Sequence, residues 1–252
     1  MGESPKSILI IKLSAIGDVV HALPFLEVLR KNFPEARLDW VVEEESSQII
    51  DVHGAIDKVI ISRRKSWQKS LLKGRKGFVA LREIIQFLKE LRSNEYDLVI
   101  DLQGLFKSAI LTGLSRGKRK IGPNWGREGS QLFFTERPFF VEADKHAVDK
   151  YLKVAEYLGC EKDSWKGHIP IRESDKSSID KILDDKGVQN QRLVAINPFA
   201  KWTTKLWESE RFAALADRMQ KELGCGIIFT GSGQDRAEID EIMERMHEKS
   251  TN

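Results

Sequence analysis

The sequence is short of cysteine, of long apolar runs and of net charge, and each shortage excludes a class of protein. Its 252 residues include two cysteines, Cys160 and Cys225, which have neither metal-site nor redox-motif spacing and are expected in the core or at helix ends. This usage is typical of a reducing compartment. No run approaches the roughly 18 apolar residues of a membrane span, and the first residues, MGESPKS, lack the apolar segment of a signal peptide. We therefore expect a globular protein of the cytoplasm.

The net charge is only +3, which argues against a protein that wraps nucleic acid, so no nucleic-acid partner is expected. The positive residues are nevertheless concentrated in one basic segment, residues 63–76, which contains Trp67 and no acidic residue. Its cations are Arg63, Arg64, Lys65, Lys69, Lys73, Arg75 and Lys76. Such a segment suits an anionic partner; the alternative is a solvated loop whose charge is incidental.

Strand-like apolar runs alternate with amphipathic helical segments along the first part of the chain. Strands are expected at residues 8–13, 38–42, 58–62, 96–102 and 118–121, and helices over 78–91, 106–114 and 146–158. This alternation predicts an α/β fold with a doubly wound parallel sheet. Because the chain turns polar between Cys160 and Gln191, we place the domain boundary there and assign residues 1–165 to the first domain.

Residues 166–252 are expected to form a linker and an incomplete second domain. Two strands, at residues 193–197 and 226–230, are each followed by a helix. Two parallel strands cannot bury a sheet on both faces, and a Rossmann-like half needs on the order of 100–150 residues. We therefore expect the second domain to be truncated in this chain.

Asp18 is the first candidate for chemistry, in the turn that follows the first expected strand. The carboxyl ends of strands are where α/β proteins bind ligands, and Gly17 would allow a tight turn there. Asp18 could act as a general base on a substrate hydroxyl, or it could simply cap the next helix. His21 is expected to support the turn by packing or hydrogen bonding.

A second candidate site lies in NPFAKWTTKLW, the cationic and hydroxyl-rich turn after the strand at residues 193–197. Its candidate ligands for a diphosphate are Lys201, Thr203, Thr204 and Lys205. The turn lacks the Gly-rich Walker pattern, which disfavours an ATPase. In the next turn, Gly231 adds a small residue and Asp235 could hold a ribose or cap a helix. An acid in one domain and a phosphate cradle in the other describe a transferase.

Five separated motifs carry a resemblance to a known family. In order they are ILIIKLSAIGDVVHALP, LDWVVEE, IDLQGLFKSA, WGRE and NPFAKWTTKLW. Together they resemble glycosyltransferase family 9, in particular its lipopolysaccharide heptosyltransferases of type I, over essentially the whole chain. The resemblance implies a GT-B fold, with two Rossmann-like domains that bind the acceptor and the ADP-heptose donor respectively. It also implies inverting transfer of L-glycero-D-manno-heptose to Kdo of the lipopolysaccharide inner core, without a cofactor or a metal ion.

The resemblance also assigns roles to individual residues. Asp18 matches the catalytic base, and Lys205 matches the lysine that binds the donor phosphates. The positions that match acceptor contacts are Arg63, Arg64, Lys65 and Arg127, with Gln103 as a further polar contact. Glu43, Glu44 and Glu45 are interpreted as structural. A Kdo-lipid A acceptor is anionic, so the basic segment would meet it at a membrane surface, on the cytoplasmic face of the inner membrane.

Two departures from the family pattern limit these expectations. Ala200 and Lys201 stand where relatives often have a Thr-Thr pair, and a later Asp-x-Gly-x-x-His motif of the donor site is absent. Little transfer is therefore expected from this chain alone. A heptosyltransferase of type II and a truncated, non-enzymatic nucleotide- or anion-binding module remain the alternatives.

Overall fold

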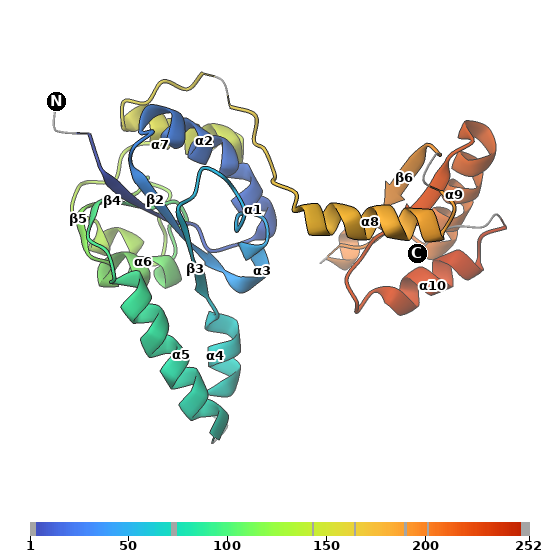
Figure 1. Cartoon of the computed structure of the whole chain (residues 1–252), viewed down its shortest axis with the longest axis horizontal. Coiled ribbons are helices and arrows are strands. Elements are labelled where there is room, and N and C mark those ends of the chain that lie inside the picture. The colour runs from blue at the N-terminus through green and yellow to red at the C-terminus, as the bar shows by residue number, and fades with distance from the viewer. Residues whose placement is uncertain are drawn as a thin grey trace. The chain divides into compact units, whose positions relative to one another are not determined.

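The computed structural model describes residues 4–71, 75–142, 144–163, 165–188, 191–200 and 202–247. The chain divides into two compact units, Met1–Ile171 and Arg172–Asn252, each with its own parallel sheet (Figure 1). The expected α/β class with parallel sheets is therefore confirmed. The functional division after residue 165 stays a prediction.

The first sheet has the strand order β3-β2-β1-β4-β5, with all neighbours parallel. Its strands are β1 (Ser7–Ile11), β2 (Arg37–Glu43), β3 (Lys58–Ser62), β4 (Tyr96–Asp101) and β5 (Gly117–Ile121). In the central strand, Ile8 and Ile10 contribute to one hydrophobic cluster, and Leu9 and Ile11 to another. Because both faces are covered, β1 is a continuous apolar run.

Helices cover both faces of this sheet. They are α1 (Ile16–His21), α2 (Leu23–Asn32), α3 (Glu44–Ser47), α4 (Arg64–Ser70), α5 (Arg75–Leu91), α6 (Phe106–Leu114) and α7 (Ala147–Tyr157), with a short 3-10 helix at Ser130–Phe133. The cluster that contains Ile8 is completed by α1, α2 and α7, and the cluster that contains Leu9 by α4 and α5. Gly159, with φ of +78°, follows α7 as the sequence indicates.

The basic segment is not the loop that the sequence suggests. Residues Arg64–Ser70 form α4, and α5 already begins at Arg75, whereas Lys73 lies outside the described residues. The polar sequence of α4 lacks the apolar pattern that predicts a helix, because a single large apolar side chain, Trp67, attaches this helix to the core. The centre of the Trp67 ring lies 5.3 Å from that of Phe87. The two helices extend together from the sheet (Figure 1).

The second unit contains α8 (Glu173–Asp185), β6 (Leu193–Ile196), a 3-10 helix at Thr203–Lys205, α9 (Ser209–Leu223), β7 (Gly226–Phe229) and α10 (Arg236–Glu244). Its small core includes Ile227, Phe229 and Ile239. β6 is mostly half-exposed, because β7 is its one paired neighbour among the described residues. In neither unit does a described helix combine the length and apolar composition of a membrane span.

Candidate functional site

Asp18 lies in the first turn of α1, directly beyond the carboxyl end of β1. The backbone N–H of Ala15 donates to its Oδ2 at 3.2 Å, so the carboxylate does stabilise the helix start. Its side chain is nevertheless 47% exposed. The Ala15 N–H and Lys12 both contact Oδ2. The other oxygen has no hydrogen-bond partner among the described residues and is available to a ligand.

Lys12 is the cation beside Asp18, and its Nζ lies 3.7 Å from Asp18 Oδ2. The lysine is almost fully buried, with Nζ 5.4 Å from the centre of the Tyr151 ring. Burial lowers the pKa of Lys12, and the nearby Asp18 and Asp101 carboxylates oppose that shift. A buried lysine at the end of a central strand is costly unless it has a partner, so this pair marks a specialised site.

The turn after β4 supports the loop that carries Asp18. Gln103 Oε1 accepts hydrogen bonds from the backbone N–H groups of Leu13 and Ser14, both at 3.1 Å. The buried Asp101 in turn accepts from the N–H groups of Gln103 and Gly104, both at 2.9 Å. Burial raises the pKa of Asp101, whereas these bonds oppose the shift. Gln103, predicted to contact the acceptor substrate, thus has its carbonyl oxygen engaged, and its amide N–H₂ has no hydrogen-bond partner in the part of the chain that the structure describes.

A cavity of about 350 Å³ opens over these residues. It brings together Asp18, Gln103 and Arg127, three of the residues selected from the sequence. The same cavity is lined by Lys12, Lys150 and Tyr151, which sequence reasoning missed. Three cations around one carboxylate make the cavity suitable for an anionic ligand that also presents a hydroxyl group.

The predicted acceptor cations 63–65 pair with the three glutamates at the end of β2 and the start of α3, next to a second, smaller cavity that Arg63 and Lys65 line. Arg63 Nε is 2.8 Å from Glu44, Arg64 Nη2 is 3.2 Å from Glu43, and Lys65 Nζ is 3.0 Å from Glu45. The basic segment contains no acid of its own, but the parallel pairing of β2 with β3 places acids next to it. Its exposed pairs, Arg63–Glu44 and Lys65–Glu45, are weak, so an anionic ligand can compete for these cations.

Glu43 differs from its two neighbours because it is buried. Lys107 Nζ lies 3.0 Å from Glu43 Oε1 and donates to Ser14 Oγ at 2.7 Å, which ties the loop before Asp18 to this carboxylate. Burial alone would raise the pKa of Glu43, but Lys107 and Arg64 outweigh it and lower the pKa. The interpretation of Glu43 as structural agrees with these contacts.

The candidate donor residues belong to the second unit. Thr203, Thr204 and Lys205 form an exposed 3-10 helix rather than the start of α9, which begins at Ser209. Lys201 lies outside the described residues.

Gly231 and Asp235 lie in the loop that joins β7 to α10. Asp235 Oδ2 accepts from both the N–H and the hydroxyl of Ser232 at 2.7 Å, so it closes this loop. A Cβ at Gly231 would lie 3.1 Å from the Asp235 and Ile239 side chains, which explains the small residue.

One of the missed residues carries a signal that could have been used. Lys12 is a charged residue at the end of a strand that is otherwise apolar and buried, and a charged residue there needs a partner. Lys150 and Tyr151 come from α7, far along the chain, and no local pattern connects them with Asp18. Among the described residues, no group of three His, Cys, Asp or Glu side chains could hold a metal ion.

Comparison with known proteins places the chain in a family. The sequence model for "Glycosyltransferase family 9 (heptosyltransferase)" matches residues 84–252. The chain belongs to glycosyltransferase family 9. Lipopolysaccharide heptosyltransferase 1 of Escherichia coli strain K12 is 38% identical to this chain over 172 residues, which cover 65% of this chain and 51% of that protein.

Solved structures of the family have the same fold. A family 9 glycosyl transferase from Veillonella parvula superposes with a TM-score of 0.80 at 27% identity, covering 98% of this chain and 69% of that one. The E. coli heptosyltransferase WaaC with ADP-2-deoxy-2-fluoro heptose gives 0.76 at 28%, covering 98% and 76%. This chain spans 51% to 65% of the length of the first curated relatives it matches.

Proposed function

We propose that the chain is an ADP-heptose-dependent glycosyltransferase that transfers heptose to Kdo of the lipopolysaccharide inner core. The observation that carries this proposal is the Asp18 carboxylate, oriented by Lys12 and the Ala15 N–H inside a cavity rimmed by cations. Membership of family 9 and the 38% identity to a lipopolysaccharide heptosyltransferase 1 support the choice of substrates.

On the acceptor side, the free Oδ1 of Asp18 takes the proton of the Kdo hydroxyl as its oxygen attacks the anomeric carbon of the heptose. The bond from that carbon to the ADP phosphate oxygen breaks, and ADP leaves from the opposite face, which inverts the configuration. Lys12 holds the carboxylate by its other oxygen, so the base keeps a single orientation.

On the donor side, the departing diphosphate gains negative charge that must be neutralised. Lys205 is the proposed phosphate ligand, assisted by Lys201, Thr203 and Thr204. Gly231 leaves room in the next turn, where Asp235 would contact the ribose. The structure of E. coli WaaC with ADP-2-deoxy-2-fluoro heptose supports an ADP-sugar donor.

Recognition of the acceptor rests on positive charge. Arg127 and Gln103, together with Lys150, would bind the Kdo carboxylate, and Arg63, Arg64 and Lys65 would bind lipid A phosphates. A lipid-linked acceptor places the protein at the cytoplasmic face of the inner membrane, with the basic segment toward the bilayer.

The test measures heptose transfer from ADP-heptose to Kdo-lipid A together with ADP-heptose affinity. Asp18→Ala is expected to lower the transfer rate by about 10²-fold or more with unchanged donor affinity, because the base is lost and the candidate donor residues lie in the other unit. Lys205→Ala is expected to weaken donor binding. A folded Asp18→Ala protein that transfers heptose at the wild-type rate would overturn the proposal.

The alternative of a non-enzymatic nucleotide-binding module predicts a different result in the same assay. A nucleotide-binding module would bind ADP-heptose, but neither it nor any variant would transfer heptose. Robust transfer by the 252-residue chain itself would show that the expectation of little activity is wrong.

A further inference from the structure

Helix α5 has an apolar stripe on its surface. Phe78, Leu81 and Ile85 follow the i, i+3, i+7 spacing that places them on one face of a helix. Their exposed fractions are 74%, 49% and 47%, and the neighbouring Val79 is exposed as well. The adjacent face, with Ala80, Phe87 and Leu91, is buried in the core, so the stripe is the exposed margin of a broad apolar face. The outer stripe has no partner among the described residues that would explain it.

The charged residues of α5 also differ in position by sign, with cations beside the stripe and acids away from it. Arg75, Arg82 and Lys89 lie at one border of the stripe at helical spacing, are exposed, and form no ion pair with any described residue. The two acids of the helix point elsewhere: Glu83 Oε2 accepts from the Trp67 indole N–H at 2.8 Å, and Glu90 binds Lys58 at 3.0 Å.

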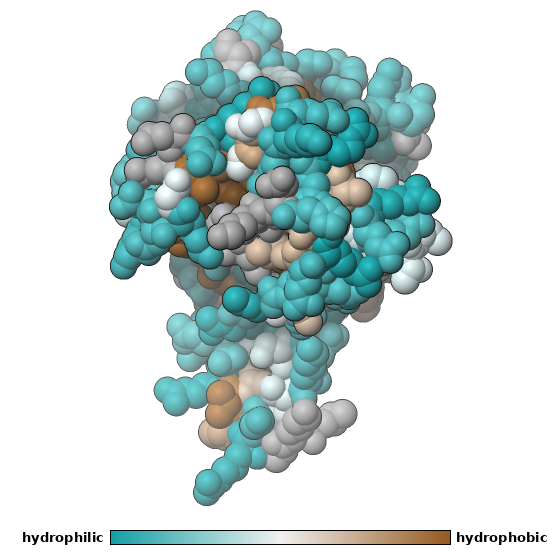
Figure 2. Space-filling view, turned by 90° about the vertical axis from the view of Figure 1, so that its right-hand side faces the viewer, coloured by the Kyte–Doolittle hydropathy of each residue, from teal (hydrophilic) through white to brown (hydrophobic). Residues whose placement is uncertain are grey.

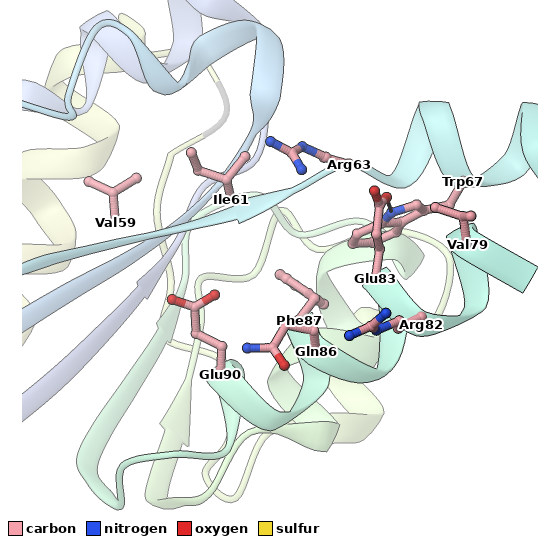
Figure 3. Close-up of a pocket in the computed structure, with 10 residues that line it drawn as sticks. All are labelled: Val59, Ile61, Arg63, Trp67, Val79, Arg82, Glu83, Gln86, Phe87 and Glu90. Atoms are coloured by element: carbon pink, nitrogen blue, oxygen red, sulfur yellow. Dashed lines mark hydrogen bonds between the residues drawn. The ribbon is translucent and has the colours of Figure 1, made fainter.

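Figure 3 shows Glu83 turned toward Trp67 of α4, and Glu90 near β3. Both acids belong to the wall of a hollow of about 480 Å³ between β3 and the two helices. The α4 and α5 projection, at the bottom of Figure 2, carries hydrophobic surface among hydrophilic residues. Arg82 also lines this hollow, whereas Arg75, Lys89 and the three stripe side chains do not.

We propose that α5 docks on an anionic lipid bilayer, with the stripe Phe78, Leu81 and Ile85 at the level of the acyl chains and Arg75, Arg82 and Lys89 on the headgroups. An amphipathic helix with a cationic border is the usual element that lies in a membrane interface. This inference deepens the proposed function, on which it rests, because it assigns the bilayer contact to α5 rather than to the acceptor-binding cations of residues 63–65.

Charge complementarity favours a bilayer over a second copy of the chain. No acid of α5 borders the stripe, so two stripes facing each other would bring like charges together. An anionic membrane instead attracts each cation by about 1 kcal/mol, which is about fivefold in affinity per residue.

The test is co-sedimentation with phosphatidylcholine vesicles, with and without roughly one third phosphatidylglycerol as the anionic lipid. Wild-type protein is expected to bind the anionic vesicles, less so at high salt, and to bind neutral vesicles weakly. The double variant Phe78→Ser, Ile85→Ser should bind at least about tenfold more weakly because both side chains leave the acyl region. Arg82→Gln, Lys89→Gln should lose about 25-fold, at about fivefold for each cation.

A matched control comes from α8, where Ile179 and Ile182 are exposed to a similar degree. Ile179→Ser, Ile182→Ser should bind vesicles as the wild type does. Circular dichroism checks that all variants are folded. Equal binding by the Phe78 and Ile85 variant, or equal binding to neutral and anionic vesicles, would overturn the proposal, as would self-association that the stripe variant abolishes.

The outcome separates docking from catalysis. The stripe variant should still bind ADP-heptose with wild-type affinity, because the donor residues lie in the other unit. If vesicle binding follows the expected pattern but the wild type does not bind ADP-heptose, the docking element stands and the proposed function fails.

Discussion

Glu43 is the residue that organises the cationic end of the first sheet. Its side chain is 1% exposed, yet Arg64, Lys65 and Lys107 all lie within ion-pair distance. Through Lys107 and Ser14 it also holds the loop before Asp18. A buried carboxylate with this many cationic partners stabilises the fold only while it is ionised.

Replacing Glu43 by glutamine is expected to lower the free energy of unfolding by about 2–3 kcal/mol, since charged hydrogen bonds are lost inside the protein. The pKa of Glu43 is lowered by folding, so its contribution is present above its unfolded pKa of 4.5 and is lost as pH falls through the folded pKa. Urea denaturation at pH 7 and pH 4 measures both effects. Glu45→Gln, whose side chain is 53% exposed, is the control and should change stability by less than about 0.5 kcal/mol. Equal losses in both variants would contradict the role of Glu43.

Lys12→Met is expected to separate stability from activity. Methionine fills the buried volume without a charge, so unfolding should require as much free energy as before, or more, whereas heptose transfer falls because Asp18 loses its orienting cation. Burial lowers the pKa of Lys12 in the folded protein below its ordinary value of 10.5. At pH values between the two, the unfolded chain binds a proton that the folded protein does not. The free energy of unfolding of the wild type, relative to the variant, therefore rises with pH in that range. Thermal denaturation at pH 7 and pH 10, with transfer rates at pH 7, gives the comparison. A variant that transfers normally would show that Lys12 does not orient the base.

At the scale of elements, the turn after β4 depends on a single glycine. Gly104 has φ of +67°, and a Cβ there would lie 3.1 Å from Trp125 Cδ1. Gly104→Ala should therefore lower the free energy of unfolding by about 1–2 kcal/mol, because both the left-handed conformation and the close approach oppose a side chain. Gly54→Ala, with open space around it and no positive φ, is the control for chemical denaturation. Similar effects at the two positions would show that the turn tolerates a side chain.

Helices and strands whose apolar residues recur at regular spacing were predictable from the sequence. A helix attached to the core by one tertiary contact was not. Strand β3 and helix α6 have the bounds that the sequence indicates, because apolar runs and helical spacing are local signals. Helix α4 was missed because its attachment to the core depends on Trp67 meeting Phe87 of another helix. Parallel pairing explains why Asp18 and Gln103 lie together: they follow the neighbouring strands β1 and β4.

On the scale of the whole molecule, the two units have separate hydrophobic clusters. In the described residues, the cluster around Ile227, Phe229 and Ile239 shares no member with the two clusters of the first unit. Phe229→Ala should therefore destabilise the second unit by about 3–5 kcal/mol without loosening the first. Hydrogen exchange followed by mass spectrometry should show faster exchange in β6 and β7 and unchanged exchange in β1 and β4. Faster exchange throughout would mean that the units unfold together.

The separate clusters also have an evolutionary consequence. A substitution that reshapes the turns after β6 or β7 changes the packing around Phe229 but leaves the residues that hold Asp18 untouched. The preference for the nucleotide sugar and the preference for the acceptor can then evolve independently of each other. A lineage could adopt a new donor without rebuilding the surroundings of Asp18, the proposed base.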